Sequence, residues 1–276
     1  MKIDLAIDPL APGLGQCVVE KCPRRYDAEM SKLLIIKTGS APGHVAAVHG
    51  DFEEWFLVGL GLDASEVMVV DVQAGESLPE SSKTLAGVLV TGSPAMVSHR
   101  EDWSERAADW IAEAHRSALP MLGVCYGHQL IAHALGGHVG PNPAGRRMGT
   151  RTVEIQSDAS DLLGELEPTV QVHATHVEAV LKLPPESRVI AETHGDPHHA
   201  LHFGQRSWGV QFHPEFTVDI MASYIHLRAS ELLNEGQCPD TLLDGLEKTP
   251  HGYQLLRSFA KRLETNADVS QPSNAV

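Results

Sequence analysis

The chain has 276 residues, of which 42% are hydrophobic, and a formal net charge of −15. This length allows one large domain or two small ones, and the composition supplies enough apolar side chains for a substantial core. The acidic excess and the lack of a clustered Lys/Arg run argue against a nucleic-acid-binding surface. No apolar stretch approaches the roughly 18 residues of a membrane-spanning helix, and the N-terminus lacks the basic start and apolar core of a secretory signal.

The cysteines show no disulfide framework. Only four are present, Cys17, Cys22, Cys125 and Cys238, and their spacing is irregular. A reducing compartment is the usual home of such a chain. We therefore expect a cytoplasmic protein that binds neither nucleic acid nor membrane.

The chain divides into four segments by pattern. Residues 1–29 contain several Pro and Gly residues and no sustained hydrophobic period, which predicts a flexible N-terminal extension. Residues 30–235 carry the periodic apolar pattern of a folded domain. Residues 236–264 are expected to form a C-terminal helical extension, and residues 265–276 have the composition of a disordered tail.

Within the domain, strand and helix patterns alternate. The expected parallel strands lie at residues 32–37, 66–72, 87–90, 119–124 and 208–212, and helices are expected at 51–61 and 103–118. Such alternation implies βαβ units with right-handed crossovers. Shorter, mostly antiparallel strands are expected at 150–156, 169–173, 188–191 and 201–203, with single helices at 216–233 and 249–263. The predicted fold class is α/β, a doubly wound, mostly parallel open sheet with flanking helices and a small antiparallel addition.

The segment Gly123-Val-Cys125-Tyr-Gly127 is typical of a nucleophile elbow. Small residues two before and two after the cysteine allow a tight turn between strand and helix. At the helix N-terminus, free N–H groups and the helix dipole favour a thiolate, and the N–H of Tyr126 can face an oxyanion. A buried structural cysteine beside packing glycines is the alternative.

A second segment, Gly209-Val-Gln-Phe-His213-Pro-Glu215, supplies a histidine just after a short apolar strand and a carboxylate two residues on. These are a base and the group that orients it, which a cysteine nucleophile requires. Alone, His213 could be an ordinary loop histidine. The acid follows the histidine here, whereas in α/β-hydrolases it precedes it, so that class is disfavoured.

The two segments together resemble the signature blocks of the class I (triad-type) glutamine amidotransferases, most closely stand-alone proteins similar to the glutaminase half of GMP synthase. The resemblance covers residues 33–233, and 88 residues separate Cys125 from His213. It implies that Cys125 is the nucleophile, His213 the base and acid, and Glu215 the group that orients His213.

Two further blocks fit the resemblance. Gly92-Ser93-Pro94 is similar to the family's Gly-Gly-Pro, which implies that Gly92 lies at the substrate and the Ser93 N–H contributes to the oxyanion site. Serine in place of glycine raises the question of a glycine-specific backbone angle. Thr175 and His176 occupy the positions of a Ser-His pair that holds the substrate's α-amino and carboxylate groups, and Gln129 matches a glutamine that lies along the substrate. Each of these could instead be a plain turn, loop or helix-surface residue.

Neither a cofactor nor a metal is predicted. Residues 194–202 contain four histidines and Asp196, but Gly195-Asp196-Pro197 has the chemistry of a hairpin turn, which we favour over a metal site. Arg146 and Arg147 are interpreted as loop charges, with an acceptor- or partner-facing role as the minor alternative.

Three functions are consistent with these residues. The first is a glutamine amidotransferase or glutaminase that passes ammonia to a separate acceptor-binding synthetase subunit. The second is a γ-glutamyl peptidase or hydrolase acting on other γ-glutamyl amides. The third is a non-catalytic amidotransferase-like binding protein, which the intact set of Cys125, His213 and Glu215 disfavours.

Overall fold

The computed structural model describes residues 32–156 and 162–267. The expected extension at residues 1–29 and most of the expected tail lie outside these ranges. The strands, in chain order, are β1 (Lys32–Lys37), β2 (Val67–Asp71), β3 (Leu85–Val90), β4 (Met121–Val124), β5 (His138–Pro141), β6 (Arg147–Ile155), β7 (Thr169–His176), β8 (Glu178–Lys182), β9 (Arg188–Thr193), β10 (Asp196–His202) and β11 (Ser207–Val210).

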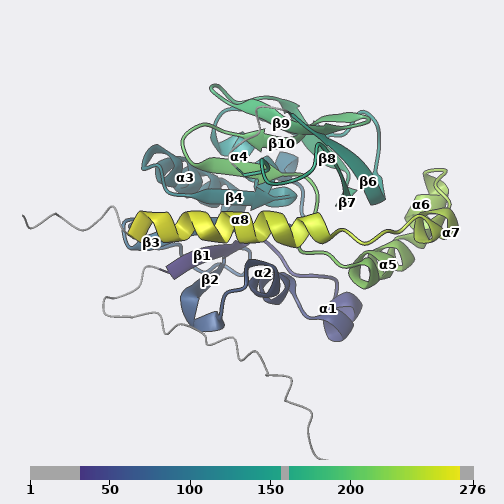
Figure 1. The fold of residues 1–276 in the computed structure, drawn as a ribbon, viewed down its shortest axis with the longest axis horizontal. Coiled ribbons are helices and arrows are strands. Elements are labelled where there is room, and N and C mark those ends of the chain that lie inside the picture. The colour runs from purple at the N-terminus through teal and green to yellow at the C-terminus, as the bar shows by residue number, and fades with distance from the viewer. Residues whose placement is uncertain (1–31, 157–161, 268–276) are drawn as a thin grey trace, which may run out of the picture. The chain divides into compact units, whose positions relative to one another are not determined.

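Nine of these strands form one mixed sheet in the order β2-β1-β3-β4-β11-β10-β9-β6-β7 (Figure 1). The first five are parallel neighbours, and each later pair is antiparallel. β5 and β8 form a separate antiparallel pair. The expected α/β fold class with an antiparallel addition is therefore confirmed.

Helices cover both faces of the sheet. They are α1 (Gly43–His49), α2 (Phe52–Leu60), α3 (Asp102–Arg116), α4 (Tyr126–Ala134), α5 (Val218–Leu227), α6 (Ala229–Asn234), α7 (Pro239–Asp244) and α8 (Pro250–Ala267), with short 3-10 helices η1 (Ala64–Glu66) and η2 (Val97–His99). α3 and α4 contribute Ile111 and Leu130 to one buried cluster. α2, α5 and α8 contribute Phe56, Ile225 and Phe259 to a second, and Figure 1 shows α8 in front of the parallel strands. Burial on both faces explains why these strands are continuous apolar runs rather than alternating ones.

Several elements differ from the sequence-based prediction. The single helix expected at 216–233 is wrong, because Arg228 has non-helical angles (φ −97°, ψ 12°) and separates α5 from α6. The short elements α1, α7, β5 and β8 were not predicted. The last helix continues to Ala267, past the expected start of the tail at residue 265.

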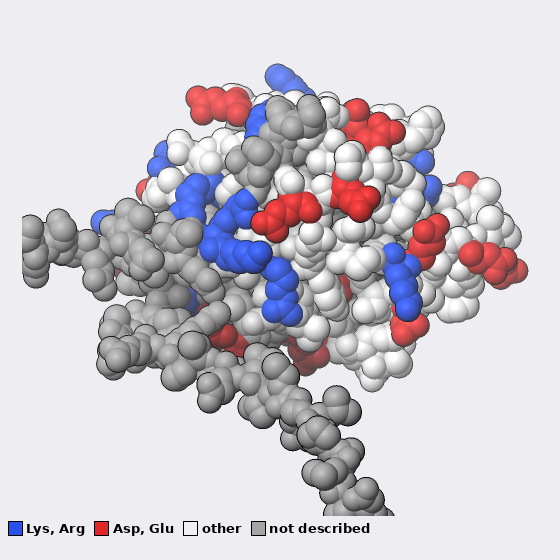
Figure 2. Space-filling model, viewed as in Figure 1, with Lys and Arg blue, Asp and Glu red and all other residues white. Residues whose placement is uncertain are grey.

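Charge is unevenly distributed over the surface. Figure 2 shows Asp and Glu side chains scattered over one face, whereas Lys and Arg gather along α8, which carries Arg257, Lys261 and Arg262. No helix within the described residues combines the length and apolar character needed to cross a bilayer.

Candidate active site

Cys125 lies at a sharp turn between β4 and α4. Its backbone has φ 52° and ψ −102°, a conformation that residues with side chains rarely adopt. A Cβ added at Gly123 would collide with the carbonyl group of Gly127, and one added at Gly127 would collide with the carbonyl of Val90. Both glycines are therefore needed for close packing of strand, turn and helix, which is the physical basis of the Gly-x-Cys-x-Gly pattern.

The thiol of Cys125 is free and almost buried, with 6% of the residue exposed. Its sulfur lies 3.7 Å from the carbonyl oxygen of Thr175 on β7. The N-terminus of α4 stabilises negative charge at this point through its free N–H groups and its dipole.

His213 follows β11 and is held on three sides. Its Nδ1 donates a hydrogen bond to Oε1 of Glu215 over 2.7 Å, and Glu215 is completely buried. The imidazole stacks on Phe216, with ring centroids 4.1 Å apart, and lies nearly parallel to Phe52 at 6.5 Å. Because Nδ1 bonds to the carboxylate, Nε2 is the nitrogen left for proton exchange with Cys125.

The charges around His213 favour its protonated form. Burial would lower its pKa, but the charges of Glu215 and Cys125 and hydrogen bonds to both raise the pKa of His213 to about 10. The neighbouring His173 has its pKa shifted in the opposite direction. Its backbone carbonyl accepts a 2.8 Å hydrogen bond from the His213 N–H. Burial and the positive charge of His213 lower the pKa of His173 to about 4, so His173 is neutral.

Ser93 and Tyr126 offer two backbone N–H groups near the thiol. Neither N–H donates to another group in the part of the chain that the structure describes. Ser93 does not have a positive φ, so no glycine-specific backbone angle is required there. Its turn is anchored by Thr38, whose Oγ1 lies 3.0 Å from the carbonyl oxygens of both Thr91 and Gly92.

The structure brings seven of the nine predicted site residues around one pocket of about 90 Å³. These are Ser93, Cys125, Tyr126, Gln129, Thr175, His176 and His213. The other two lie behind the wall. Glu215 accepts the hydrogen bond from His213. Gly92 lies so close to His213 that an added Cβ would be 3.0 Å from Cε1 of its ring. A pocket of this volume suits only a small molecule.

Gln129 is 4% exposed and is fixed by a network that the sequence did not reveal. Its Nε2 donates to the carbonyl oxygen of Glu178 at 2.8 Å and to Oε1 of Gln211 at 2.9 Å. With both amide hydrogens used, Gln129 offers a ligand its Oε1 as an acceptor.

The imidazole of His176 also belongs to a buried network. Its Nδ1 donates to the carbonyl of Glu178 at 2.9 Å, its side chain is 1% exposed, and burial lowers its pKa to about 3. Its Nε2 lies 3.6 Å from Oδ2 of Asp196, which accepts a 3.0 Å hydrogen bond from Nδ1 of His199. His176 therefore offers the pocket its backbone rather than a free side chain.

His176, Asp196 and His199 could hold a metal ion by ligand type, since their ligand atoms lie within 4.8 Å of one another. Asp196 and His199 come from the His-rich segment, in which the turn of the expected hairpin is confined to His194 and Gly195 and the remainder is β10, whereas His176 comes from β7. Burial alone would raise the pKa of Asp196, but the hydrogen bond from His199 outweighs burial and lowers this pKa to about 2. The carboxylate thus already has a partner, and we assign no metal to this cluster.

The pocket is also lined by residues that were not predicted as site residues, among them Tyr224, Arg228 and Arg146, which was interpreted as a loop charge with an acceptor- or partner-facing role as the minor alternative. Arg146 forms a two-point ion pair with Glu235, at 2.8 and 3.1 Å, and Arg228 bonds to Glu231 at 3.1 Å. Tyr224 also lines the pocket, and burial raises its pKa, so its phenol stays protonated. No local motif marks these residues. Arg146 lies in the loop between β5 and β6, Tyr224 lies on α5, and Arg228 follows the last residue of α5.

An open α/β sheet with a cysteine on a strained turn, a buried histidine–carboxylate pair and free N–H groups at the ends of parallel strands defines the class of cysteine-dependent acyl-transfer proteins. The sequence profile of the family "Glutamine amidotransferase class-I" matches residues 57–227, which is more than half of the chain. The chain belongs to this family.

Among similar sequences are two proteins named GMP synthase [glutamine-hydrolyzing]. The protein from Aeropyrum pernix is 38% identical over 157 residues, which cover 56% of this chain and 28% of the relative. That from Cytophaga hutchinsonii is 36% identical over 140 residues, covering 50% of this chain and 26% of the relative. The similarity therefore spans only about a quarter of these relatives.

Solved structures share the fold. A glutamine amidotransferase from Thermotoga maritima superimposes with a TM-score of 0.68 at 21% identity and covers 85% of this chain and 98% of its own. A glutamine amidotransferase from Methylobacillus flagellatus gives a TM-score of 0.66 at 20% identity, covering 86% and 95%.

Proposed function

We propose that this protein hydrolyses the side-chain amide of glutamine through Cys125, His213 and Glu215. The observation that carries the proposal is the meeting of the Cys125 elbow with the His213–Glu215 pair at one small pocket. Family membership and relatives named as glutamine-hydrolysing enzymes support the choice of glutamine. An intact set of reactive groups argues against a purely non-catalytic binding protein.

The proposed reaction has two steps. The Cys125 thiolate attacks the amide carbon of glutamine, and the N–H groups of Ser93 and Tyr126 stabilise the oxyanion. Protonated His213 gives its Nε2 proton to the departing ammonia, leaving a γ-glutamyl thioester on the sulfur. Neutral His213 then takes a proton from water, which attacks the thioester, and glutamate leaves as the thiolate is restored.

Glu215 has a positioning role in this scheme. Its carboxylate fixes the Nδ1–H tautomer of His213 and stabilises the imidazolium. Gln129 Oε1 and the backbone at Thr175 and His176 are proposed to hold the α-amino and α-carboxylate end of the substrate.

We propose further that the ammonia passes to an acceptor-binding synthetase partner. Support comes from the relatives, in which the matched region is 28% or less of a protein named as a synthase.

The test is ammonia release from glutamine by the purified chain, compared with a panel of γ-glutamyl amides and repeated with cell extract. The proposal expects slow turnover of glutamine alone and acceleration by extract. Strong preference for γ-glutamyl dipeptides would instead assign the γ-glutamyl hydrolase activity. No release from any substrate, with or without extract, would favour a binding protein.

A further inference from the structure

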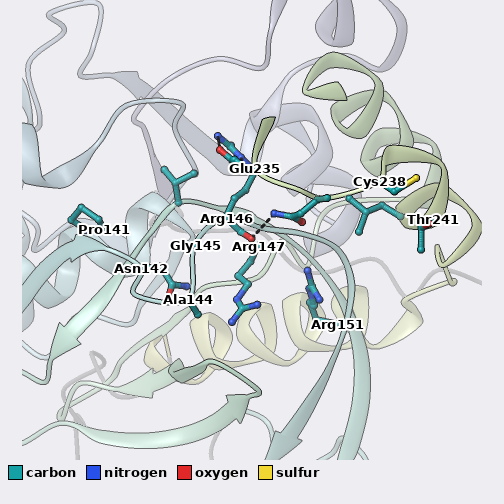
Figure 3. A pocket seen from close by; sticks show the side chains of 13 residues that line it. Pro141, Asn142, Ala144, Gly145, Arg146, Arg147, Arg151, Glu235, Cys238 and Thr241 are labelled. Atoms are coloured by element: carbon teal, nitrogen blue, oxygen red, sulfur yellow. Dashed lines mark hydrogen bonds and ion pairs between the residues drawn. The ribbon is translucent and has the colours of Figure 1, made fainter. Parts of the chain in front are cut away.

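A second, larger pocket adjoins the candidate active site. Its volume is about 750 Å³, and it shares Arg146 and Val177 with the smaller pocket. The loop before β6, β6 itself and the segment from Glu235 to α7 line it (Figure 3). This volume falls in the range of roughly 300–1,000 Å³ that is usual for small-molecule sites.

The charge of this pocket is opposite to that of the chain as a whole. Its charged lining residues are Arg146, Arg147, Arg151 and Glu235, three positive and one negative, in a chain of net charge −15. Glu235 is committed to Arg146 by two hydrogen bonds. Arg147 and Arg151 are therefore left without a carboxylate partner among the described residues.

The two guanidinium groups repel each other. Burial, followed by the positive charge of Arg147, lowers the pKa of Arg151. Among the described residues, Arg151 donates only from Nη2 to the carbonyl of Met148, at 3.0 Å, and Arg147 has no side-chain partner. Both project from β6 into the pocket in Figure 3.

Three buried donors at this pocket have no acceptor within residues 32–156 and 162–267: Nε of Arg147, Nε of Arg151 and Nδ2 of Asn142. The orientation of the Asn142 amide is fixed, because its Oδ1 accepts a 2.9 Å hydrogen bond from the N–H of Ala144. Asn142 is 6% exposed, so its unpaired Nδ2 carries a desolvation cost. All three unsatisfied groups are donors, and what they require is an acceptor-rich anion.

We infer that this pocket binds a small molecule bearing a phosphate or a carboxylate group, held by Arg147, Arg151 and Asn142. Guanidinium groups bind both kinds of oxyanion through paired N–H donors, and Asn142 adds a neutral donor. The bound anion separates the two like charges and satisfies the three orphan donors.

Arg146 couples this site to the candidate active site, because its side chain lines both pockets. If a bound anion breaks the ion pair of Arg146 with Glu235, the Arg146 side chain moves and the lining of the smaller pocket changes. We therefore expect the anion to change the KM for glutamine. This coupling rests on the proposed glutaminase activity, whereas anion binding does not.

The test is titration calorimetry of the full chain at low chloride with three probes: inorganic phosphate, pyrophosphate and citrate. We expect saturable one-to-one binding of at least one probe with a Kd below about 1 mM. Preference for pyrophosphate would identify a phosphate ligand, and preference for citrate a carboxylate ligand. Arg147→Gln and Arg151→Gln should each weaken binding by roughly ten-fold or more, whereas Arg106→Gln, an exposed site on α3, should not.

Thermal unfolding without ligand separates a binding role from a structural one. Arg147→Gln removes one of two repelling charges, so we expect its melting temperature to equal or exceed that of the wild type. Absence of saturable binding for all three probes, or equal binding by the wild type and both pocket variants, would overturn the site. An unchanged KM for glutamine at saturating probe would overturn the coupling alone.

Discussion

The Nδ1 of His213 lies 2.7 Å from Oε1 of Glu215, and both side chains are buried. A charge-assisted hydrogen bond of this length, shielded from water, stabilises an imidazolium far more than an exposed pair would. Stacking on Phe216 keeps the ring in the plane that this bond requires. The pair therefore sets both the orientation and the charge of His213.

Replacing Glu215 should change how the free energy of unfolding depends on pH. The pKa of His213 is raised to about 10, so its contribution to stability is complete below its ordinary value of about 6.5 and is lost as pH rises through 10. Glu215→Gln removes the charge and should flatten the decline. Urea unfolding at several pH values between 6 and 10 measures this. Equal slopes for the two proteins would show that Glu215 does not raise the pKa of His213.

Cys125 should be the only cysteine required for turnover. Cys125→Ser is expected to lower glutamine hydrolysis by at least about 10³-fold, because a serine hydroxyl is a far weaker nucleophile than a thiolate. Cys238→Ser is the matched control for labelling, since Cys238 is a free, exposed thiol outside the small pocket. A glutamine-like electrophile should label Cys125 alone by mass spectrometry. Labelling of Cys238 in its place would contradict the assignment.

The turn at Cys125 should depend on Gly127 for steric reasons. Gly127→Ala forces a Cβ against the carbonyl of Val90, and we expect it to destabilise the chain by about 2–4 kcal/mol. Gly43→Ala is the control, because no atom lies within 4 Å of an added Cβ there and alanine favours a helix. The midpoint of urea unfolding measures both. A Gly127 variant as stable as the Gly43 variant would show that the elbow relaxes without cost.

The sequence predicted the elements whose patterns are local. Parallel strands such as β1 are continuous apolar runs, and the elbow is marked by its glycines, so both could be placed in advance. α1 buries only Val45 and has no side-chain N-cap, which leaves little periodic signal. The break at Arg228 carries neither Gly nor Pro, so the pattern there continues as one helix.

In the site, too, residues marked by a local sequence pattern could be predicted, whereas contacts between distant parts of the sequence could not. The candidate triad in the two motifs was predicted, whereas the hydrogen bonds that fix Gln129 to Gln211 and Glu178 were not. Gln211 lies in the second motif, but these contacts span 82 and 49 positions of the sequence. The anion pocket is a further example. Arg146 and Glu235 meet across 89 positions, and only the folded chain shows that Arg147 and Arg151 lack such a partner among the residues that the structure describes.

Substitutions at the adjacent residues Ser93 and Gly92 should differ in the size of their effect on turnover. The contribution of Ser93 is a backbone N–H, and its φ is not positive, so Ser93→Gly should change glutamine turnover by no more than about three-fold. Gly92→Ala places a Cβ 3.0 Å from Cε1 of His213 and should displace the ring, with a loss of kcat of roughly ten-fold or more. Steady-state kinetics of both variants, with circular dichroism to verify folding, provides the measurement. If Ser93→Gly instead increased turnover many-fold, the serine would be holding its N–H away from the oxyanion, and the geometry described for this turn would be wrong.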